Sequence, residues 1–309
     1  MKSMKILFAG SPDSSAQILK SLYKDSIEIV GVITQPDKRS KRGGGLGPSA
    51  VSIVAEDLGL PLFKPLDINN AFKQTISAIK FDFLVVSAYG KILPNWLLDM
   101  PDISSINIHF SLLPKYRGAS PIQAAILNSD KVTGISIMKM TSGLDEGPVY
   151  SMHNLDILSF DNKKDVEKKL TLLSIKVLKS DLEQIFSGKL QPLEQETSGV
   201  EYCKKITKMS GIADFANESS DSIIQKFKAY HEWPGLFFMK NNITIKIHGL
   251  VVTKELSCNY VGNNYQFTND GMLVKTIDKN IVITHLQFPG KRIITAKDAS
   301  NSYSNFFKK

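Results

Sequence analysis

Apolar and polar positions in the first half of the chain follow two alternating periods. Residues 5–9, 27–34 and 83–87 are short runs of apolar and β-branched residues, which predict strands buried on both faces of a sheet. Segments 14–23 and 48–58 predict helices, the first with its apolar residues on one helical face. Strands that alternate with helices predict a Rossmann-like, doubly wound, mostly parallel sheet in an α/β domain.

The pattern continues beyond residue 100 with three more strands and one long helix. Residues 106–109 predict a buried strand, and 133–140 and 149–155 predict strands on either side of a glycine-rich turn. Segment 161–185 has the spacing of a long amphipathic helix. In such sheets, ligands bind beyond the carboxyl ends of the parallel strands, so we expect the functional site there.

The pattern changes after residue 188. Residues 189–207 show little apolar periodicity and predict a linker between a domain at 1–188 and a second domain at 208–309. The second domain begins with a predicted helix and continues with short strands separated by Asn, Asp and Gly turns, which predicts an OB-like β-barrel. The predicted elements are 219–230, 243–252, 265–268, 272–276 and 281–288.

Composition narrows the class of protein. No apolar run among the 309 residues is long enough to span a bilayer, and the two cysteines, Cys203 and Cys258, suggest a reducing cytoplasm. The histidines lack the spacing of metal ligands, so we expect no metal site. We interpret Trp233, Phe237 and Phe238 as core residues because they lie in an apolar run.

Candidate chemistry gathers at the end of the strand 106–109. Asn107 and His109 are two residues apart, so on a strand their side chains project to the same face. An amide can donate to a developing oxyanion, and an imidazole can exchange a proton or stabilise the same charge. Asp145, in a turn between Gly143 and Gly147, is the candidate to orient the ring. These types suit acyl transfer without a protein nucleophile, although a structural, hydrogen-bonded histidine remains an open alternative.

A cluster of positive charge follows the second predicted strand. Lys38, Arg39, Lys41 and Arg42 are four cations within five residues, and three glycines come next. The formal charge of the chain is +8, which is compatible with a polyanionic partner. Such a loop on the rim of the sheet suits contact with RNA phosphates, while an ordinary solvated surface loop is the alternative.

Several segments together carry a family likeness. They are Ala88–Pro94, Asn107–His109, Ser111–Pro114, Arg117–Gly118, Pro121–Gln123, Gly143–Gly147 and Trp233–Gly235. The set resembles the folate-dependent formyltransferase family along nearly the whole chain, and most closely its members that act on tRNA. The chain departs from the family pattern at Phe110, where a small residue is expected, and at Thr141 and Ser142.

The resemblance implies a reaction and a set of residues. Asn107, His109 and Asp145 would be catalytic, with Asn107 and a protonated His109 holding the oxyanion and Asp145 supporting the histidine. The co-substrate would be 10-formyltetrahydrofolate, the acceptor the α-amine of initiator methionyl-tRNA, and the protein a cytoplasmic monomer that needs no metal. Arg42 would be the leading tRNA contact of the cationic loop. The implied folate contacts are Tyr89, Lys91, Ile92, Leu93, Ser111, Leu112, Leu113, Pro114 and Met140.

Two other functions use the same features. A formyltransferase could act on a small amine, such as glycinamide ribonucleotide or an amino-sugar nucleotide, or a hydrolase could pass the formyl group to water. Both would lack the cationic insertion and the second domain. A non-catalytic RNA-binding protein would use the basic elements alone, but it would not need Asn107, His109 and Asp145 together.

Overall fold

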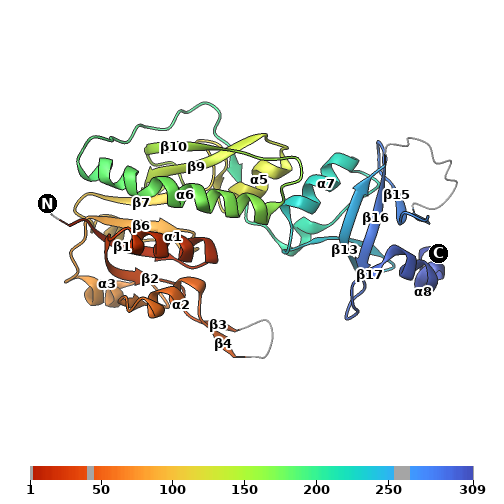
Figure 1. Cartoon of the computed structure of the whole chain (residues 1–309), viewed down its shortest axis with the longest axis horizontal. Coiled ribbons are helices and arrows are strands. Elements are labelled where there is room, and N and C mark those ends of the chain that lie inside the picture. Colours follow the sequence, from red (N-terminus) through yellow and green to blue (C-terminus); the bar gives the residue numbers. More distant parts are fainter. Residues whose placement is uncertain (1–2, 40–44, 254–264, 309) are drawn as a thin grey trace. The chain divides into compact units, whose positions relative to one another are not determined.

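The computed structural model describes residues 3–39, 45–253 and 265–308. The chain divides into two compact units (Figure 1). The first consists of Met1–Pro121, Lys131–Ile157 and Asp165–Cys203, and the second of Ile122–Asp130, Leu158–Lys164 and Lys204–Lys309. The predicted division at residues 188 and 207 is a different one and stays a prediction.

The first unit is built on a seven-stranded sheet with the strand order β10-β9-β7-β6-β1-β2-β5. Strands β7, β6, β1, β2 and β5 are parallel, while β9 and β10 run antiparallel to their neighbours. The predicted doubly wound, mostly parallel sheet is therefore confirmed. The strands are β1 (Lys5–Gly10), β2 (Glu28–Ile33), β5 (Leu62–Phe63), β6 (Phe83–Ser87), β7 (Ser104–His109), β9 (Val132–Lys139) and β10 (Val149–Asp156).

Alternate residues of the central strands are buried against helices on each face. On one face, Leu7 and Ala9 of β1 share a core cluster with Phe72 of α3 (Asn70–Ile76) and Leu97 of α4 (Asn95–Leu98). The other face is covered by α1 (Asp13–Lys24) and α6 (Lys163–Phe186), as Figure 1 shows. Helix α2 (Ala50–Asp57) lies beside α1. Burial on both faces explains why these strands are almost uninterrupted apolar runs.

The carboxyl ends of the parallel strands meet at one rim, where the backbone is tied by side chains. Ser15 Oγ donates to the carbonyl of Ser87 at 2.6 Å, and Gln35 Nε2 donates to the carbonyl of Tyr89 at 2.8 Å. The ends of β1, β2 and β6 are thus fixed to one another. The rim is the place where a ligand of this fold class is expected.

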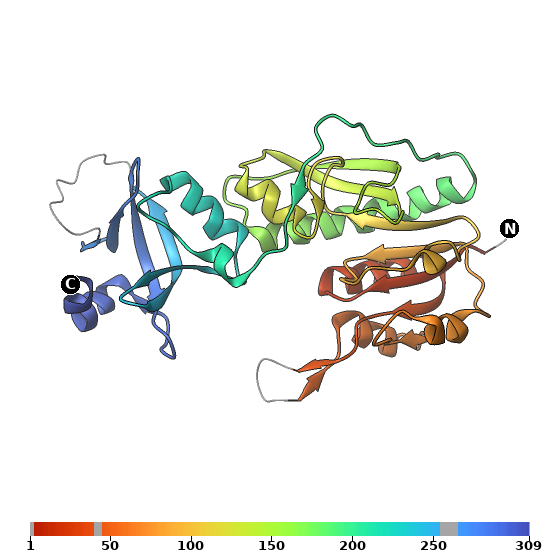
Figure 2. The same cartoon turned by 180° about the vertical axis from the view of Figure 1, so that it is seen from behind.

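The stretch that follows α6 is packed against the first unit. Residues 193–203 run along the edge strand β10 (Figures 1 and 2) and form a bridge between Leu193 and Val149. The stretch ends in β11 (Tyr202–Cys203), which pairs in parallel with β8 (Arg117–Gly118). Most residues of this stretch are exposed, in keeping with its lack of apolar periodicity.

The second unit contains an antiparallel sheet with the order β12-β13-β16-β15-β14, and β17 pairs with β16. This confirms an antiparallel β-domain at the carboxyl end of the chain. Among the described residues, no pairing joins the edge strands β12 and β14. The elements are η1 (Lys208–Gly211), α7 (Ser220–Ala229), β12 (Leu236–Lys240), β13 (Ile243–Val252), β14 (Tyr265–Phe267), β15 (Met272–Lys275), β16 (Asn280–Gln287), β17 (Ile294–Thr295) and α8 (Ala296–Lys308), and α5 (Pro121–Leu127) lies largely in this unit.

Aromatic side chains fill the core of this sheet domain. Phe238 is 1% exposed and stacks with Tyr265 at a ring-centroid distance of 5.6 Å. Phe237 is also buried, as predicted, but Trp233 is 50% exposed. The prediction of a core position for Trp233 was wrong because this residue lies in the turn before β12, where the apolar run has not yet entered the sheet. In the described part of the chain, no helix has the length and apolar character to cross a membrane.

Candidate active site

Strand β7 delivers two polar side chains to the rim of the first sheet. The side chains of Ile106 and Ile108 are buried on one face of the strand. Because successive side chains of a strand point to opposite faces, Asn107 and His109 lie together on the other face. The His109 side chain is 6% exposed, whereas Asn107 is half-buried. The predicted pairing of an amide and an imidazole at this strand end is therefore observed.

The Asp145 carboxylate reaches the same place from the turn that follows β9. Its Oδ2 accepts a hydrogen bond from the backbone N–H of Gly118 at 2.8 Å and lies 3.7 Å from Nδ1 of His109. Its Oδ1 accepts from Nδ2 of Asn107 at 3.4 Å. The three side chains that the sequence singled out are thus brought together, while their catalytic roles remain predictions.

The other ring nitrogen of His109 is fixed by the backbone. Nε2 lies 3.0 Å from the carbonyl oxygen of Tyr116, and a carbonyl can only accept, so Nε2 carries a hydrogen. Burial lowers the pKa of His109 below its ordinary value, and the nearby charge of Asp145 opposes that shift. This shift favours the neutral ring, in which the hydrogen is on Nε2 and the lone pair is on Nδ1, the nitrogen 3.7 Å from the Asp145 carboxylate.

Backbone conformation in these turns requires particular residues. Gly118 has a φ of +120°, and a Cβ at this position would collide with the carbonyl of Cys203. Gly147 has no room for a Cβ because the carbonyl of Lys139 lies against it. Asp145 itself adopts a left-handed φ of +52°, which is uncommon for a residue with a side chain. The carboxylate is held where it is by its surroundings, at a local conformational cost.

The predicted folate contacts occupy varied positions. Tyr89 and Leu93 are buried in one core cluster, and Met140 packs against that cluster from the 140–145 loop. Ile92 is 95% exposed on the rim. The ammonium of Lys91 donates to the carbonyls of Pro65 and Leu66, so it is already engaged.

The exit from β7 is held by serine hydroxyls. Ser136 Oγ donates to the carbonyl of Ser111 at 2.8 Å and accepts from the N–H of Leu113 at 3.0 Å. Ser111 and Leu113 are buried, and Leu112 and Pro114 are half-buried. Contact of this turn with a folate remains a prediction, and so does contact of residues 89–93 and of Met140 with the folate.

The cationic loop begins in a short hairpin. Lys38, which is exposed, and Arg39 form β3 (Lys38–Arg39), which pairs with β4 (Leu46–Gly47). Figure 1 shows this hairpin projecting from the first unit beyond the end of β2. Lys41 and Arg42 lie outside the described residues, so their predicted contact with tRNA remains a prediction.

Sequence reasoning missed the groups that support the Asp145 turn. Gln195 Nε2 donates to the carbonyls of Asp145 and Gly147, and Gln195 Oε1 accepts two hydrogen bonds from Arg117. Gln195 lies in the predicted linker, where no local pattern marks it. Arg117 was noticed only as part of a motif.

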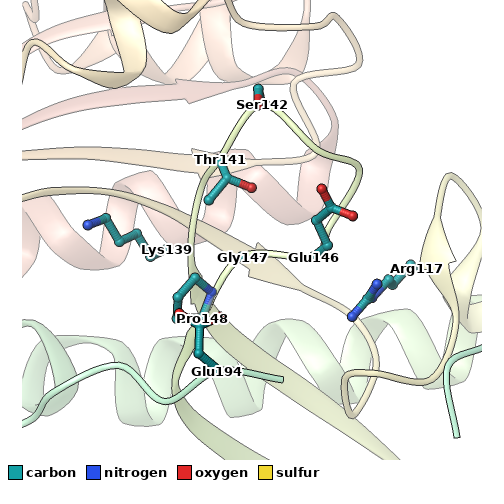
Figure 3. Close-up of a pocket in the computed structure, with 8 residues that line it drawn as sticks. All are labelled: Arg117, Lys139, Thr141, Ser142, Glu146, Gly147, Pro148 and Glu194. Atoms are coloured by element: carbon teal, nitrogen blue, oxygen red, sulfur yellow. The ribbon is translucent and has the colours of Figure 1, made fainter. Parts of the chain in front are cut away.

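A polar pocket of about 520 Å³ lies beside the same turn (Figure 3). Its walls carry charges of both signs, from Arg117 and Lys139 and from Glu146 and Glu194. The glutamates of the pocket come from two segments, the turn that contains Asp145 and the stretch after α6. Asn107, His109 and Asp145 are not among the residues that line this pocket.

Comparison with known proteins gives two matching families and many relatives. The Formyl transferase family matches residues 4–182, and the Formyl transferase, C-terminal domain family matches residues 205–304. A methionyl-tRNA formyltransferase of Francisella tularensis subsp. mediasiatica is 38% identical over 304 residues, covering 97% of this chain and 96% of that protein. The methionyl-tRNA formyltransferase of Francisella philomiragia subsp. philomiragia is also 38% identical, over 303 residues, with the same coverage.

Solved structures share the fold at lower identity. WlaRD, a sugar 3N-formyl transferase determined in the presence of dTDP and 5-N-formyl-THF, has a TM-score of 0.67 and 21% identity, covering 94% of this chain and 100% of that one. HypX from Aquifex aeolicus in complex with tetrahydrofolic acid has a TM-score of 0.66 and 16% identity, covering 99% of this chain and 48% of that one. These two similarities establish the fold.

Proposed function

Since the chain belongs to the formyl transferase family, we propose that it transfers the formyl group of 10-formyltetrahydrofolate to the α-amine of initiator methionyl-tRNA. The observation that carries the proposal is the convergence of Asn107, His109 and Asp145 at the rim of a sheet in a chain that matches methionyl-tRNA formyltransferases over 97% of its length. A domain match at residues 205–304 extends the likeness beyond the catalytic unit.

The donor side of the proposal rests on the rim loops. Met140 packs with buried Tyr89 and Leu93, while the apolar side chains of Ile92 and Leu144 are 95% and 61% exposed on the two loops. Large exposed apolar side chains beside a polar catalytic group suit a flat ring with a reactive substituent. Tyr89 would act through its backbone and its packing, because its side chain is only 2% exposed.

In the proposed reaction, the neutral amine attacks the formyl carbon and the oxygen of that carbon becomes negative. Asn107 Nδ2 then donates to the oxyanion, since its bond to Asp145 is long at 3.4 Å and is easily exchanged. The new C–N bond forms to the amine, and the C–N bond to the donor nitrogen breaks. The amine therefore loses one proton, and the donor nitrogen gains one.

His109 is suited to carry that proton. Its Nε2–H is occupied by the Tyr116 carbonyl, so only Nδ1 is open in the neutral ring. Nδ1 accepts the proton of the attacking amine, and the imidazolium, 3.7 Å from the Asp145 carboxylate, is stabilised by its charge. The protonated ring that the family resemblance implies is thus a state formed during the reaction.

The acceptor side of the proposal rests on charge. The segment that leads into the cationic loop is tied to the rim, because Gln35 Nε2 donates to the carbonyl of Tyr89 at 2.8 Å. The loop with Lys38, Arg39, Lys41 and Arg42 would therefore begin close to the site and contact the phosphates of the acceptor stem. We also predict that the protein is a cytoplasmic monomer. Size-exclusion chromatography with light scattering tests the oligomeric state.

The test is a formylation assay with three acceptor conditions. Purified protein is mixed with 10-formyltetrahydrofolate and initiator methionyl-tRNA, and formylmethionine is measured by mass spectrometry after the ester is hydrolysed. Parallel reactions contain an amino-sugar nucleotide or no amine, and formate release is measured in both. We expect formylmethionine in the first reaction only; a small-amine product, or formate release at the same rate without acceptor, would contradict the proposal. Asn107→Ala is the inactive control.

A further inference from the structure

We propose that Gln195 is a positioning residue that holds the Asp145 turn in its catalytic conformation. Every hydrogen-bonding group of its carboxamide is used. Nε2 donates to the carbonyl of Asp145 at 2.8 Å and to that of Gly147 at 2.7 Å. Oε1 accepts from Nε of Arg117 at 3.0 Å and from Nη2 at 2.8 Å. Only a primary amide of this length supplies two donors and one acceptor in this arrangement.

Burial sets Gln195 apart from its neighbours. Residues 193, 194 and 196–199 are exposed, while Gln195 is half-buried. The segment on either side is anchored, by the bridge of Leu193 to Val149 and by the pairing of β11 with β8. The backbone on both sides of Gln195 is therefore held by strand pairing, and its side chain lies in a fixed position against the Asp145 turn.

The turn needs such support because of its backbone. Asp145 has a φ of +52°, and left-handed conformations of residues other than glycine are unfavourable and persist only when neighbouring contacts enforce them. The carbonyls on which Gln195 acts belong to Asp145 itself and to Gly147. Loss of both donors would allow the turn to relax and move the carboxylate away from the Gly118 N–H, Asn107 and His109.

Arg117 supports Gln195 from behind. It is 8% exposed, and in the described part of the chain its guanidinium is bonded to neutral groups, the Gln195 carboxamide and, at 3.5 Å, the Tyr202 hydroxyl. The backbone of the same residue pair, Arg117 and Gly118, provides the N–H that binds Asp145. Arg117 thus precedes the residue whose N–H binds the Asp145 carboxylate, and its side chain also binds the carboxamide that holds the carbonyls of Asp145 and Gly147.

The first variant is Gln195→Glu, which distinguishes the role of the amide donors from that of the carbonyl acceptor. The carboxylate keeps the acceptor for Arg117, now as a charge-assisted pair that favours folding, but it loses both donors and places negative charge against two carbonyl oxygens. We expect kcat to fall about 10- to 100-fold with KM for both substrates within about twofold, as for a displaced catalytic group. The matched control is Gln191→Glu, since Gln191 is exposed in the same segment and, among the described residues, its carboxamide donates only to the carbonyl of Gly188.

The second measurement follows His109 directly by NMR titration and does not depend on activity. Asp145 raises the pKa of His109, so a displaced carboxylate should lower the titration midpoint of the ring in Gln195→Glu. In an Asp145→Asn background, Gln195→Glu should cause no further shift, because its effect acts through that charge. This inference rests on the proposed function; failure of the wild-type formylation assay would refute that function, whereas the titration would still test the positioning.

Two results would overturn the inference. One is a Gln195→Glu enzyme with the kinetics of Gln191→Glu. The other is a loss of kcat with an unchanged His109 midpoint, which would assign Gln195 a purely structural role. If Gln195→Glu does not fold, Gln195→Met has a similar length and no donor, and the same two measurements decide the question on that variant.

Discussion

Tyr89→Phe should stabilise the first unit, because the hydroxyl of Tyr89 is buried without a hydrogen-bond partner among the described residues. A hydroxyl that loses water and gains no partner costs about 1–3 kcal/mol, and phenylalanine fills the same space without it. We expect a gain of about 1 kcal/mol, which for a unit of this size corresponds to a melting temperature higher by about 2–4 °C. Activity should be unchanged, since the ring lies in the core.

The pH dependence of this gain has a definite sign. Burial raises the pKa of Tyr89 from 10.0 to about 12. Below pH 10 the hydroxyl is neutral in both folded and unfolded protein, and between pH 10 and 12 only the unfolded protein ionises, so the stability of the wild type falls as pH rises through that window. The advantage of Tyr89→Phe should therefore widen there.

Differential scanning calorimetry and urea unfolding of both proteins measure the change. The calorimetric transition of the first unit should move up, with an unchanged slope of free energy against urea. A variant that melts lower would refute the reasoning, because it would show that the hydroxyl has a partner, such as a buried water. A rise in KM for the formyl donor would instead place the hydroxyl in contact with the folate.

Other predictions concern the proposed catalytic side chains, Gly118 and the cationic loop. The NMR titration midpoint of His109 should lie below 6.5 and should fall further in Asp145→Asn; a midpoint above 6.5 would show that Asp145 outweighs burial. Asn107→Ala should lower kcat about 10²- to 10³-fold, and a smaller loss would exclude it as an oxyanion donor. Gly118→Ala should lower both melting temperature and activity, because its φ of +120° and the adjacent carbonyl exclude a Cβ; normal stability would contradict this packing. Arg42→Ala should weaken use of aminoacyl-tRNA and flatten its salt dependence, and unchanged kinetics would make the loop an ordinary surface loop.

The central strands of the first sheet could be predicted because burial on both faces produces continuous apolar runs in the sequence, whereas the two-residue β5 was not predicted. The prediction of 83–87 coincides with β6, which is buried throughout. In the second unit, the prediction of 243–252 coincides with β13. Short elements were missed for the opposite reason. β8 and β11 have two residues each and exist only because they pair with each other, 85 positions apart along the chain. Such pairing depends on tertiary contacts that local periodicity does not contain.

The candidate site also has parts that could be predicted from the sequence and parts that could not. Asn107 and His109 could be predicted because the strand period of two fixes their common face, and Asp145 because glycines mark its turn. The Tyr116 carbonyl and the Gly118 N–H, which hold His109 and Asp145, are backbone groups that every residue carries. The fold decides which backbone groups come to lie beside His109 and Asp145, so the residue types in the sequence could not identify them. Gln195 was missed for a related reason, because the groups to which it donates are also backbone carbonyls.

His109 combines two opposing influences that the proposed reaction needs at different moments. The Tyr116 carbonyl occupies Nε2, so Nδ1 must both take the proton of the amine and return a proton to the leaving nitrogen, without rotation of the ring. Burial makes the ring give up its proton, and Asp145 at 3.7 Å makes it accept one. A fully exposed histidine would keep the proton for part of the time and could not receive the next one; a buried ring without Asp145 would accept it too weakly. The distance of Asp145 from the ring therefore bears directly on the rate, which is why the hydrogen bonds that fix the Asp145 turn belong to the mechanism as much as the carboxylate does.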